Sequence, residues 1–279
     1  MSPFNGNAAE QAIERRTDLH QLLGLMRSVL LLGRVIPADG KYANSTACLA
    51  ALARGYHDSL AAMDLCFFSQ YVQARGLLRS IYEAGSIART FAHSPKLAEK
   101  WMRGEWQPDQ KARQFVANVM FADKPVEEQS QAKADYDEAY GRLSSWAHIT
   151  TMSTLGYIED LPDGGYTVQL EPEYNEETLE STLDALELEV LYLTFAARNS
   201  LNYNPASLPS EWYKIQEEIA AKIAPTYTPS GADWDSHDAT RERMFANLRP
   251  NSLLNRDLKK SSTSYANLTS DESTRTELR

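Results

Sequence analysis

Apolar residues recur every three or four positions along most of the first 224 residues, which is the spacing of one face of an α-helix. In the segment 8–36 the repeat consists of Leu19, Leu22, Leu23, Met26 and Leu30. Gly, Pro and capping residues interrupt the repeat at intervals and divide the chain into separate helices. The helices predicted from this pattern span 8–36, 44–68, 70–92, 95–105, 108–121, 126–151, 175–203 and 210–223.

The pattern changes twice along the chain. Around 154–170, two short apolar segments flank a turn with Asp163, Gly164 and Gly165, residues that tolerate the positive φ of a hairpin. From 225 onward the periodicity fades and Ser and Thr dominate, so this stretch buries too little apolar surface to offset its ordering entropy. We therefore expect an all-α multi-helix bundle in one domain, 1–224, with a small β-hairpin insertion around 154–170 and a disordered C-terminal tail, 225–279.

Several polar and aromatic residues have an expected structural role. Ser69 is the predicted N-cap of the helix 70–92, and Asn175 is the predicted N-cap of the helix 175–203, because both side chains accept hydrogen bonds from a first helical turn. Four spaced tryptophans are expected to be core or interface anchors rather than platforms for base stacking. They are Trp101, Trp106, Trp146 and Trp212.

Composition restricts the class of protein. The chain has 28 Lys and Arg against 38 Asp and Glu, a net charge of −10, which excludes a general nucleic-acid coat protein. No apolar run reaches the roughly 18 residues of a membrane span, and the first residues lack the features of a signal peptide.

Cys48 and Cys66 lie about 27 Å apart along one predicted helix, so they cannot pair with each other. Unpaired thiols indicate a reducing compartment, and we expect a cytoplasmic protein without membrane contact.

Charge is unevenly distributed along the chain. The segment 41–113 holds ten basic and six acidic side chains, whereas 171–189 holds eight acidic side chains and no basic one. A basic segment attracts phosphate locally even on an acidic protein, because charges are screened within about 10 Å. The basic segment favours RNA as a partner, and the acidic helix 171–189 or the tail favours a protein partner. Solvated helix faces are the alternative explanation of both segments.

Motifs for common cofactors and metals are missing from the sequence. It contains no GxxxxGK[ST], GxGxxG, CxxC, HExxH or GxSxG, and its five histidines are widely scattered. These absences argue against P-loop nucleotide hydrolysis, zinc hydrolysis and serine esterase chemistry. We expect a protein with no metal and no cofactor.

Two helical segments combine charged groups with core-like surroundings. In the helix 70–92, Arg75, Arg79 and Glu83 are spaced at i, i+4 and i+8, so they share one strip beside the apolar face. We expect the ends of these side chains to lie near a seam between helices.

The second segment lies in the helix 126–151. Tyr140, Ser144 and His148 also step by four, beside an apolar line through Leu143. Arg142 lies six residues before His148, which is about 120° around the helix and about 9 Å along it. Its long side chain can reach a reacting group near His148. It reaches such a group more easily if Arg142 and His148 face each other across an interface between helices or between two copies of the chain.

These segments resemble a known family. The helix beginning Gln70-Tyr-Val-Gln-Ala-Arg75 and continuing Leu78-Arg79-Ser-Ile-Tyr-Glu83 is similar to the y-x-x-A…R-x-x-x-E helix of HEPN-like domains and of related uncharacterised bacterial helical families. The later Arg142-x5-His148 resembles the R-x(4–6)-H element of HEPN domains, which also lies on a later helix. The resemblance covers roughly residues 40–200.

The resemblance implies a function and a set of site residues. HEPN domains are helical bundles, commonly dimeric, and many are metal-independent endoribonucleases in toxin–antitoxin and phage-defence systems, whereas others are non-catalytic binding modules. By resemblance, Arg142 and His148 form the catalytic pair of a homodimer that acts on RNA, in a cleft lined by Arg75 and Arg79. The chain has Leu143 where the family usually has Asn, Asp or His after the arginine, and this departure favours the non-catalytic version.

The chemistry of such a site is physically reasonable. RNA supplies its own nucleophile, the 2′-OH, and a neutral histidine can take its proton or protonate the leaving 5′-oxygen. An arginine guanidinium can bind the phosphate and stabilise charge on its oxygens, so no metal is required.

Three alternatives remain open at this point. One is a non-catalytic interaction module of the same fold, and another is a helical pocket for a small anionic ligand held by Arg75, Arg79 and His148. The third is purely structural, with Glu83 paired to Arg79 and His148 bonded to Ser144 or to a carbonyl oxygen. The predicted binding residues are Arg75, Arg79, Glu83, Tyr140 and Ser144.

Overall fold

Helices make up most of the chain that the computed structural model describes, namely residues 6–33, 43–105, 125–148, 157–160, 166–168, 172–201 and 208–223. The helices are α1 (Gly6–Glu14), α2 (Thr17–Gly33), α3 (Ala43–Phe67), α4 (Tyr71–His93), α5 (Pro95–Met102), α7 (Val126–Ala147), α9 (Glu176–Leu201) and α10 (Ser210–Ile223). Two short strands, β1 (Ile158–Asp160) and β2 (Tyr166–Val168), also occur. The predicted all-α class is confirmed for these residues.

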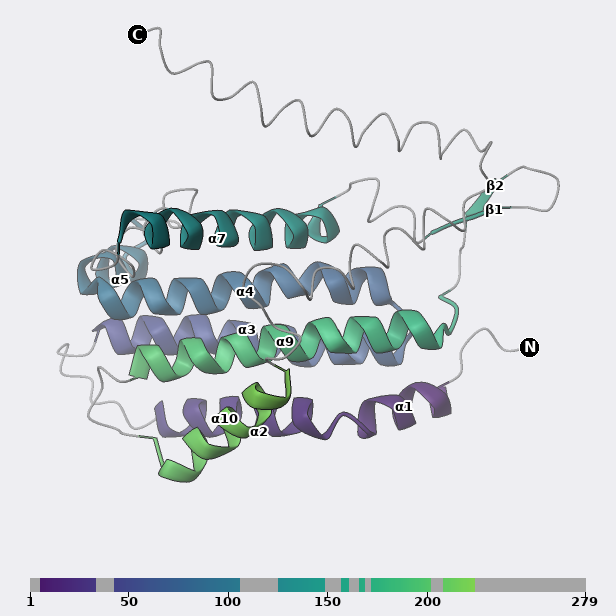
Figure 1. Ribbon diagram of the computed structural model, residues 1–279, viewed down its shortest axis with the longest axis horizontal. Coiled ribbons are helices and arrows are strands. Elements are labelled where there is room, and N and C mark those ends of the chain that lie inside the picture. Colours follow the sequence, from purple (N-terminus) through teal and green to yellow (C-terminus); the bar gives the residue numbers. More distant parts are fainter. Residues whose placement is uncertain are drawn as a thin grey trace, which may run out of the picture.

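The helix α4 lies inside the bundle and packs against α3, α9, α7 and α5. Figure 1 shows α7 along one long edge of the bundle, beside α4, and α1 and α2 along the opposite edge, with α3 and α9 between them. The helix α10 packs against α2 and α9. Among the described elements, α7 is therefore an outer helix whose main support is α4.

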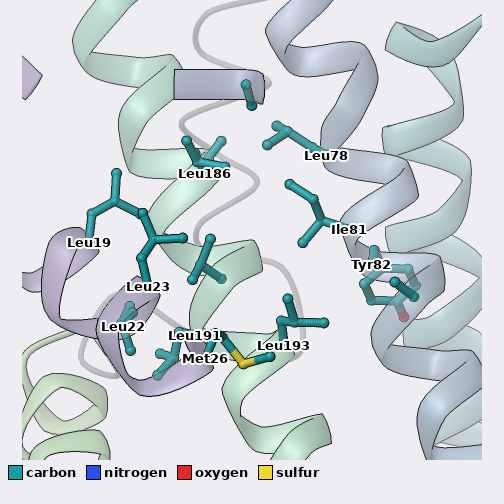
Figure 2. Close-up of a cluster of buried hydrophobic side chains, with 14 of the residues drawn as sticks. Leu19, Leu22, Leu23, Met26, Leu78, Ile81, Tyr82, Leu186, Leu191 and Leu193 are labelled. Carbon is teal, nitrogen blue, oxygen red and sulfur yellow. The ribbon is translucent and has the colours of Figure 1, made fainter. Parts of the chain in front are cut away.

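The helix α9 carries much of the hydrophobic core. In Figure 2 its apolar side chains lie between those of α2 and α4. The labelled core residues are Leu19, Leu22, Leu23 and Met26 from α2, Leu78, Ile81 and Tyr82 from α4, and Leu186, Leu191 and Leu193 from α9. Each is at most 9% exposed. Burial of each aliphatic side chain contributes about 1.5–3 kcal/mol, so this cluster is a main source of stability.

The first predicted helix is wrong in one respect, because the segment 8–36 forms two helices. The helix α1 ends at Glu14, and the turn that follows is closed by hydrogen bonds from the N–H of Arg16 to the oxygen of Ile13 and from the N–H of Thr17 to that of Arg15. No Gly or Pro marks this break in the sequence. The turn places Arg16 against the acidic side chains of α9, and local sequence patterns do not encode that tertiary contact.

One of the two predicted N-caps is confirmed. The backbone N–H of Thr178 donates to Asn175 Oδ1 at 2.8 Å, so Asn175 caps α9. Ser69 is not a cap, because it lies in the left-handed region at φ 58 within the α3–α4 turn, and the N-cap position of α4 belongs to Gln70. Ser69 instead ends α3, because its N–H donates to Cys66 O and the N–H of Gln70 donates to Leu65 O, which are the hydrogen bonds of a helix C-terminus closed by a left-handed residue.

Both cysteines and three of the four tryptophans have the predicted core role. Cys48 and Cys66 are free, buried residues of α3, and burial raises the pKa of each thiol to about 12, so neither is a nucleophile near neutral pH. Trp146 and Trp212 are 8% and 4% exposed, and Trp101 packs on Phe91. Trp106 lies outside the described residues.

The segment between α7 and α9 contains paired strands. Ile158 lies opposite Val168 and Asp160 opposite Tyr166 in an antiparallel register (Figure 1). The rest of the hairpin predicted around 154–170 is outside the described residues, as are the predicted helix 108–121 and the tail 225–279. Within the described ranges, no helix has both the length and the apolar character that crossing a bilayer requires.

Gly55 of α3 and Gly85 of α4 allow close approach of α9 in the core, and Gly85 gives a stability prediction. A Cβ at Gly85 of α4 would lie 2.7 Å from Tyr192 Cε1 of α9, whereas a Cβ at Gly141 of α7 would meet nothing within 4 Å. We expect Gly85→Ala to destabilise the fold by about 1–3 kcal/mol, because overpacking outweighs the gain in helix propensity. The control Gly141→Ala should stabilise by up to about 1 kcal/mol. Urea unfolding of both variants checks this, and stabilisation by both would contradict the close packing of α4 on α9.

Candidate functional site

Four of the predicted site residues meet at one point between α4 and α7. Arg79 Nε donates to Glu83 Oε1 at 2.9 Å, its Nη2 donates to the Tyr140 hydroxyl, and its Nη1 lies within hydrogen-bonding reach of His148 Nε2. The guanidinium carbon also lies 4.6 Å from the centre of the Tyr140 ring, which is the geometry of a cation–π contact. We call these four residues the Arg79 cluster.

Local geometry explains why these residues meet. Arg79 and Glu83 are one turn apart on α4, so their side chains are neighbours. The helix α7 runs antiparallel to α4, with Tyr136 near Tyr82 and Tyr140 near Arg79. His148 is the C-cap of α7, where an extended backbone turns the chain away from the helix axis.

The Arg79 cluster lies at the solvent edge of the seam between α4 and α7. The side chain of Arg79 is 18% exposed and that of Glu83 is 36% exposed, and His148 is exposed. An ion pair in this position contributes modestly to stability, because water and salt screen it. The same position leaves the guanidinium and the imidazole within reach of a solute.

The contact with Arg79 shows which ring nitrogen of His148 faces the guanidinium. A guanidinium has only donors, so Nε2 of the imidazole has to accept the hydrogen bond. An imidazole with an accepting Nε2 is neutral and carries its hydrogen on Nδ1. As a hydrogen bond, the contact requires the tautomer of His148 that carries its hydrogen on Nδ1.

The prediction that Arg75 lines an opening together with Arg79 is wrong, because Arg75 is buried. It is 2% exposed, and its Nε and Nη2 donate to Thr182 Oγ1 at 2.9 Å and Ser181 Oγ at 2.6 Å on α9. Its guanidinium carbon lies 4.7 Å from the centre of the Trp146 ring, which covers it from α7. Burial lowers the pKa of Arg75 to about 10. Arg75 is thus a buried link between three helices, because its strip of α4 turns under α7 at this end.

The burial of Arg75 gives a second stability prediction. Thr182→Val removes the acceptor of Arg75 Nε without changing side-chain shape, and an unpaired buried charged donor costs about 1.5–3 kcal/mol. Thr90→Val is the matched control, because the hydroxyl of buried Thr90 donates to Ser86 O of its own helix, and its loss should cost less than about 1 kcal/mol. Urea unfolding measures both. Equal losses in the two variants would show that Arg75 does not depend on Thr182.

Ser144 and Arg142 are the two remaining predicted site residues, and the structure describes the side chain of Ser144 alone. Ser144 lies between Tyr140 and His148 on α7, but its Oγ donates to Tyr140 O at 2.6 Å within the helix. Arg142 belongs to α7, but its side chain lies outside the described part of the chain. The pairing of Arg142 with His148 therefore stays a prediction.

The structure adds residues that the sequence analysis did not select. Tyr82 packs on Tyr136 of α7 at 5.4 Å and on Tyr192 of α9 at 4.8 Å between ring centres. Ser86 Oγ lies 3.0 Å from the Tyr192 hydroxyl, and the Arg89 guanidinium carbon lies 5.1 Å from the Tyr192 ring centre. These residues continue the strip of Arg75 and Arg79 at spacings of three and four. That spacing is the signal that would have found them.

The charged segments are largely used within the fold. In the basic segment, Arg54, Arg79 and Arg103 pair with carboxylates four residues away on their own helices, and Arg75 is buried. In the acidic helix, Arg16 pairs with three of the carboxylates and a fourth acidic residue is buried. These acidic residues are Glu180, Asp184, Glu187 and Glu189. The acidic helix therefore presents less net charge to a partner than its composition suggests, because Arg16 comes from outside it. In the basic segment the ion pairs are internal and leave the net charge unchanged, and only the burial of Arg75 withdraws a cation from the surface.

Metal-ligating residues are not grouped in the described ranges: no set of three or more His, Cys, Asp or Glu there is placed to hold an ion. No protein-family model matches the chain, and neither the curated proteins nor the solved structures give a significant match. The Arg79 cluster and the motif resemblance are therefore the basis on which a function is assigned.

Proposed function

We propose that this chain is a HEPN-like helical protein that cleaves the RNA backbone without a metal ion, as an endoribonuclease of a defence or stress response. The observation that carries the proposal is the contact between Arg79 and His148 at the exposed edge of the α4–α7 seam. A proton acceptor next to a fixed cation is the pair of groups that metal-independent phosphodiester cleavage needs.

Each group has a role in the proposed reaction. His148 removes the proton of a ribose 2′-OH, and the oxygen attacks the adjacent phosphorus. The bond from phosphorus to the 5′-oxygen breaks, a proton passes to that oxygen, and the products are a 2′,3′-cyclic phosphate and a 5′-hydroxyl. Arg79 binds the phosphate oxygens and stabilises the added negative charge. Arg142, the partner of His148 by resemblance, supplies a second cation.

Other residues position these groups. In the free protein, Glu83 and Tyr140 hold the plane of the Arg79 guanidinium from two helices. Ser144, one turn from both Tyr140 and His148, is proposed as a further contact to the RNA. Arg75 is excluded from this surface by its burial and supports the seam beneath Trp146.

The proposal is tested by cleavage of single-stranded RNA in the presence of EDTA. The wild-type protein should cleave, and His148→Ala should reduce the rate at least about 100-fold, because general acid–base catalysis contributes that much. His57→Ala is the matched control, since His57 is an exposed histidine of α3, and it should cleave at the wild-type rate. Equal rates for His148→Ala and wild type would eliminate the role of His148.

A second function is a non-catalytic interaction module of the same fold. The observation that favours it is the ion pair of Arg79 with Glu83, which offsets the cation, together with a net charge of −10. In this version the acidic helix or the tail binds a protein partner, and the cluster only fastens α7 to α4. A stable partner that co-purifies with an inactive chain would support this version, and RNA cleavage by the isolated chain would remove it.

A homodimer belongs to the first proposal. The HEPN resemblance implies that two copies bring their sites into one cleft, so the active species should have twice the mass of the chain. If a monomer cleaves RNA, the proposed cleavage reaction is supported and the proposed cleft between two copies is contradicted.

A further inference from the structure

All three nitrogens of Arg79 are engaged in the free protein. Nε donates to Glu83, Nη1 contacts His148 Nε2, and Nη2 donates to the Tyr140 hydroxyl. A phosphate binds a guanidinium through two parallel N–H···O bonds. Each Nη carries two hydrogens, and a phosphate that takes the hydrogens now directed at His148 and Tyr140 displaces both residues.

The same contact prevents His148 from acting as a base. Its Nε2 lone pair is occupied by the Arg79 hydrogen, and its Nδ1 carries a hydrogen in this tautomer. The imidazole can accept a proton from a substrate only after Arg79 has moved its Nη1 to another acceptor.

The partners of Arg79 differ in how easily they are replaced. Glu83 is a carboxylate on the same helix, so its charge-assisted bond to Nε persists. His148 and Tyr140 are neutral acceptors, and phosphate oxygens form bonds to a guanidinium that are roughly twice as strong. Exchange of two neutral acceptors for one anion therefore favours the anion.

We propose that the Arg79 cluster is a latch that phosphate opens: an anionic phosphate group takes the two Nη groups of Arg79 and thereby releases His148 Nε2 as the proton acceptor. This inference deepens the proposed function and rests on it. The device keeps the base inactive until a phosphate is in place.

Movement on opening is confined to the outer edge of α7. Both released side chains belong to the C-terminal part of α7 and its cap, and Arg79 and Glu83 belong to α4. Leu143 is 1% exposed, and Trp146 covers Arg75, so these contacts keep α7 on the bundle.

The first test measures the affinity for inorganic phosphate, by titration of the full chain. The latch predicts that Tyr140→Phe, which keeps the ring over Arg79, and His148→Ala each bind phosphate about two- to tenfold more tightly, because a competing acceptor is gone. Tyr213→Phe is the matched control, since Tyr213 packs on Arg198 at 5.0 Å and should leave the affinity unchanged. Weaker binding by both test variants would overturn the latch and make Tyr140 and His148 direct ligands.

The second test observes His148 by NMR of protein labelled in histidine, with its signals assigned by their loss in His148→Ala. Phosphate should change the ¹⁵N shift of Nε2 at about pH 8, and Arg79→Gln should remove this response. A DNA oligonucleotide, which has no 2′-OH and cannot be cleaved, separates the sources of phosphate. A response to both probes supports recognition of a polymer backbone, a response to inorganic phosphate alone assigns the latch to a free anion, and no response to either overturns it.

These outcomes separate the latch from the proposed function. If phosphate releases His148 but the chain does not cleave RNA, the latch is supported and the proposed endoribonuclease activity is contradicted. If the chain cleaves RNA and phosphate causes no change at His148, the endoribonuclease activity is supported and the latch is contradicted.

Discussion

Replacing Glu189 with Gln is expected to make the fold increasingly more stable than the wild type as the pH rises from about 4.5 to about 8. Glu189 lies on α9, is 5% exposed, and burial raises the pKa of its carboxyl from 4.5 to about 8. At neutral pH the native protein therefore holds this side chain as the neutral acid.

The sign of the effect follows from proton binding. Between 4.5 and about 8 the unfolded chain has released this proton and the native protein retains it, so the native state binds more protons and a rising pH favours unfolding. The stability present below pH 4.5 is lost as the pH passes through about 8. One pKa unit corresponds to about 1.36 kcal/mol, so the full change is about 4–5 kcal/mol. Gln does not ionise and does not undergo this loss.

The measurement is urea unfolding of wild type and Glu189→Gln at a series of pH values. The difference in the free energy of unfolding should grow by several kcal/mol across the window, whatever constant offset the amide introduces. Glu10→Gln is the control, because Glu10 is an exposed carboxylate of α1 and the same chemical change there involves no buried group. Stability curves of wild type and Glu189→Gln that run parallel would show that Glu189 is ionised in the native protein.

The positions of the helices follow from the sequence because apolar spacing determines which face is buried. The predicted helices 44–68 and 210–223 agree with α3 and α10 to within one residue. The break between α1 and α2 was not predictable, because Arg16 forms it by reaching carboxylates that lie more than 160 residues further along the chain. Long-range ion pairs leave no local pattern.

In the candidate site, too, local spacing predicts some features, and others depend on how the helices pack. The i, i+4 spacing of Arg79 and Glu83 predicts their pairing. The prediction that His148 lies on the same helix as Tyr140 is wrong, because α7 ends at Ala147 and His148 is its C-cap with an extended backbone. The sequence does not state how α7 is aligned on α4. That alignment buries Arg75 under Trp146 and leaves Arg79 at the solvent edge, so two arginines one turn apart have different roles.

The second large effect concerns the cooperation of Arg79 and His148 in RNA cleavage. If Arg79 binds the phosphate and His148 acts only when that phosphate is bound, the two groups act as one unit, and their losses are not additive. Arg79→Gln and His148→Ala should each reduce the cleavage rate at least about 100-fold. The double variant should be no slower than the slower single variant.

The most direct test is therefore a double-mutant cycle on cleavage of single-stranded RNA in EDTA, with folding of each variant checked by its thermal unfolding. The account predicts cleavage by the wild type, a large loss in Arg79→Gln and in His148→Ala, and a double variant no slower than the slower of the two. A wild type that leaves RNA intact, or single losses that multiply in the double variant, would contradict it.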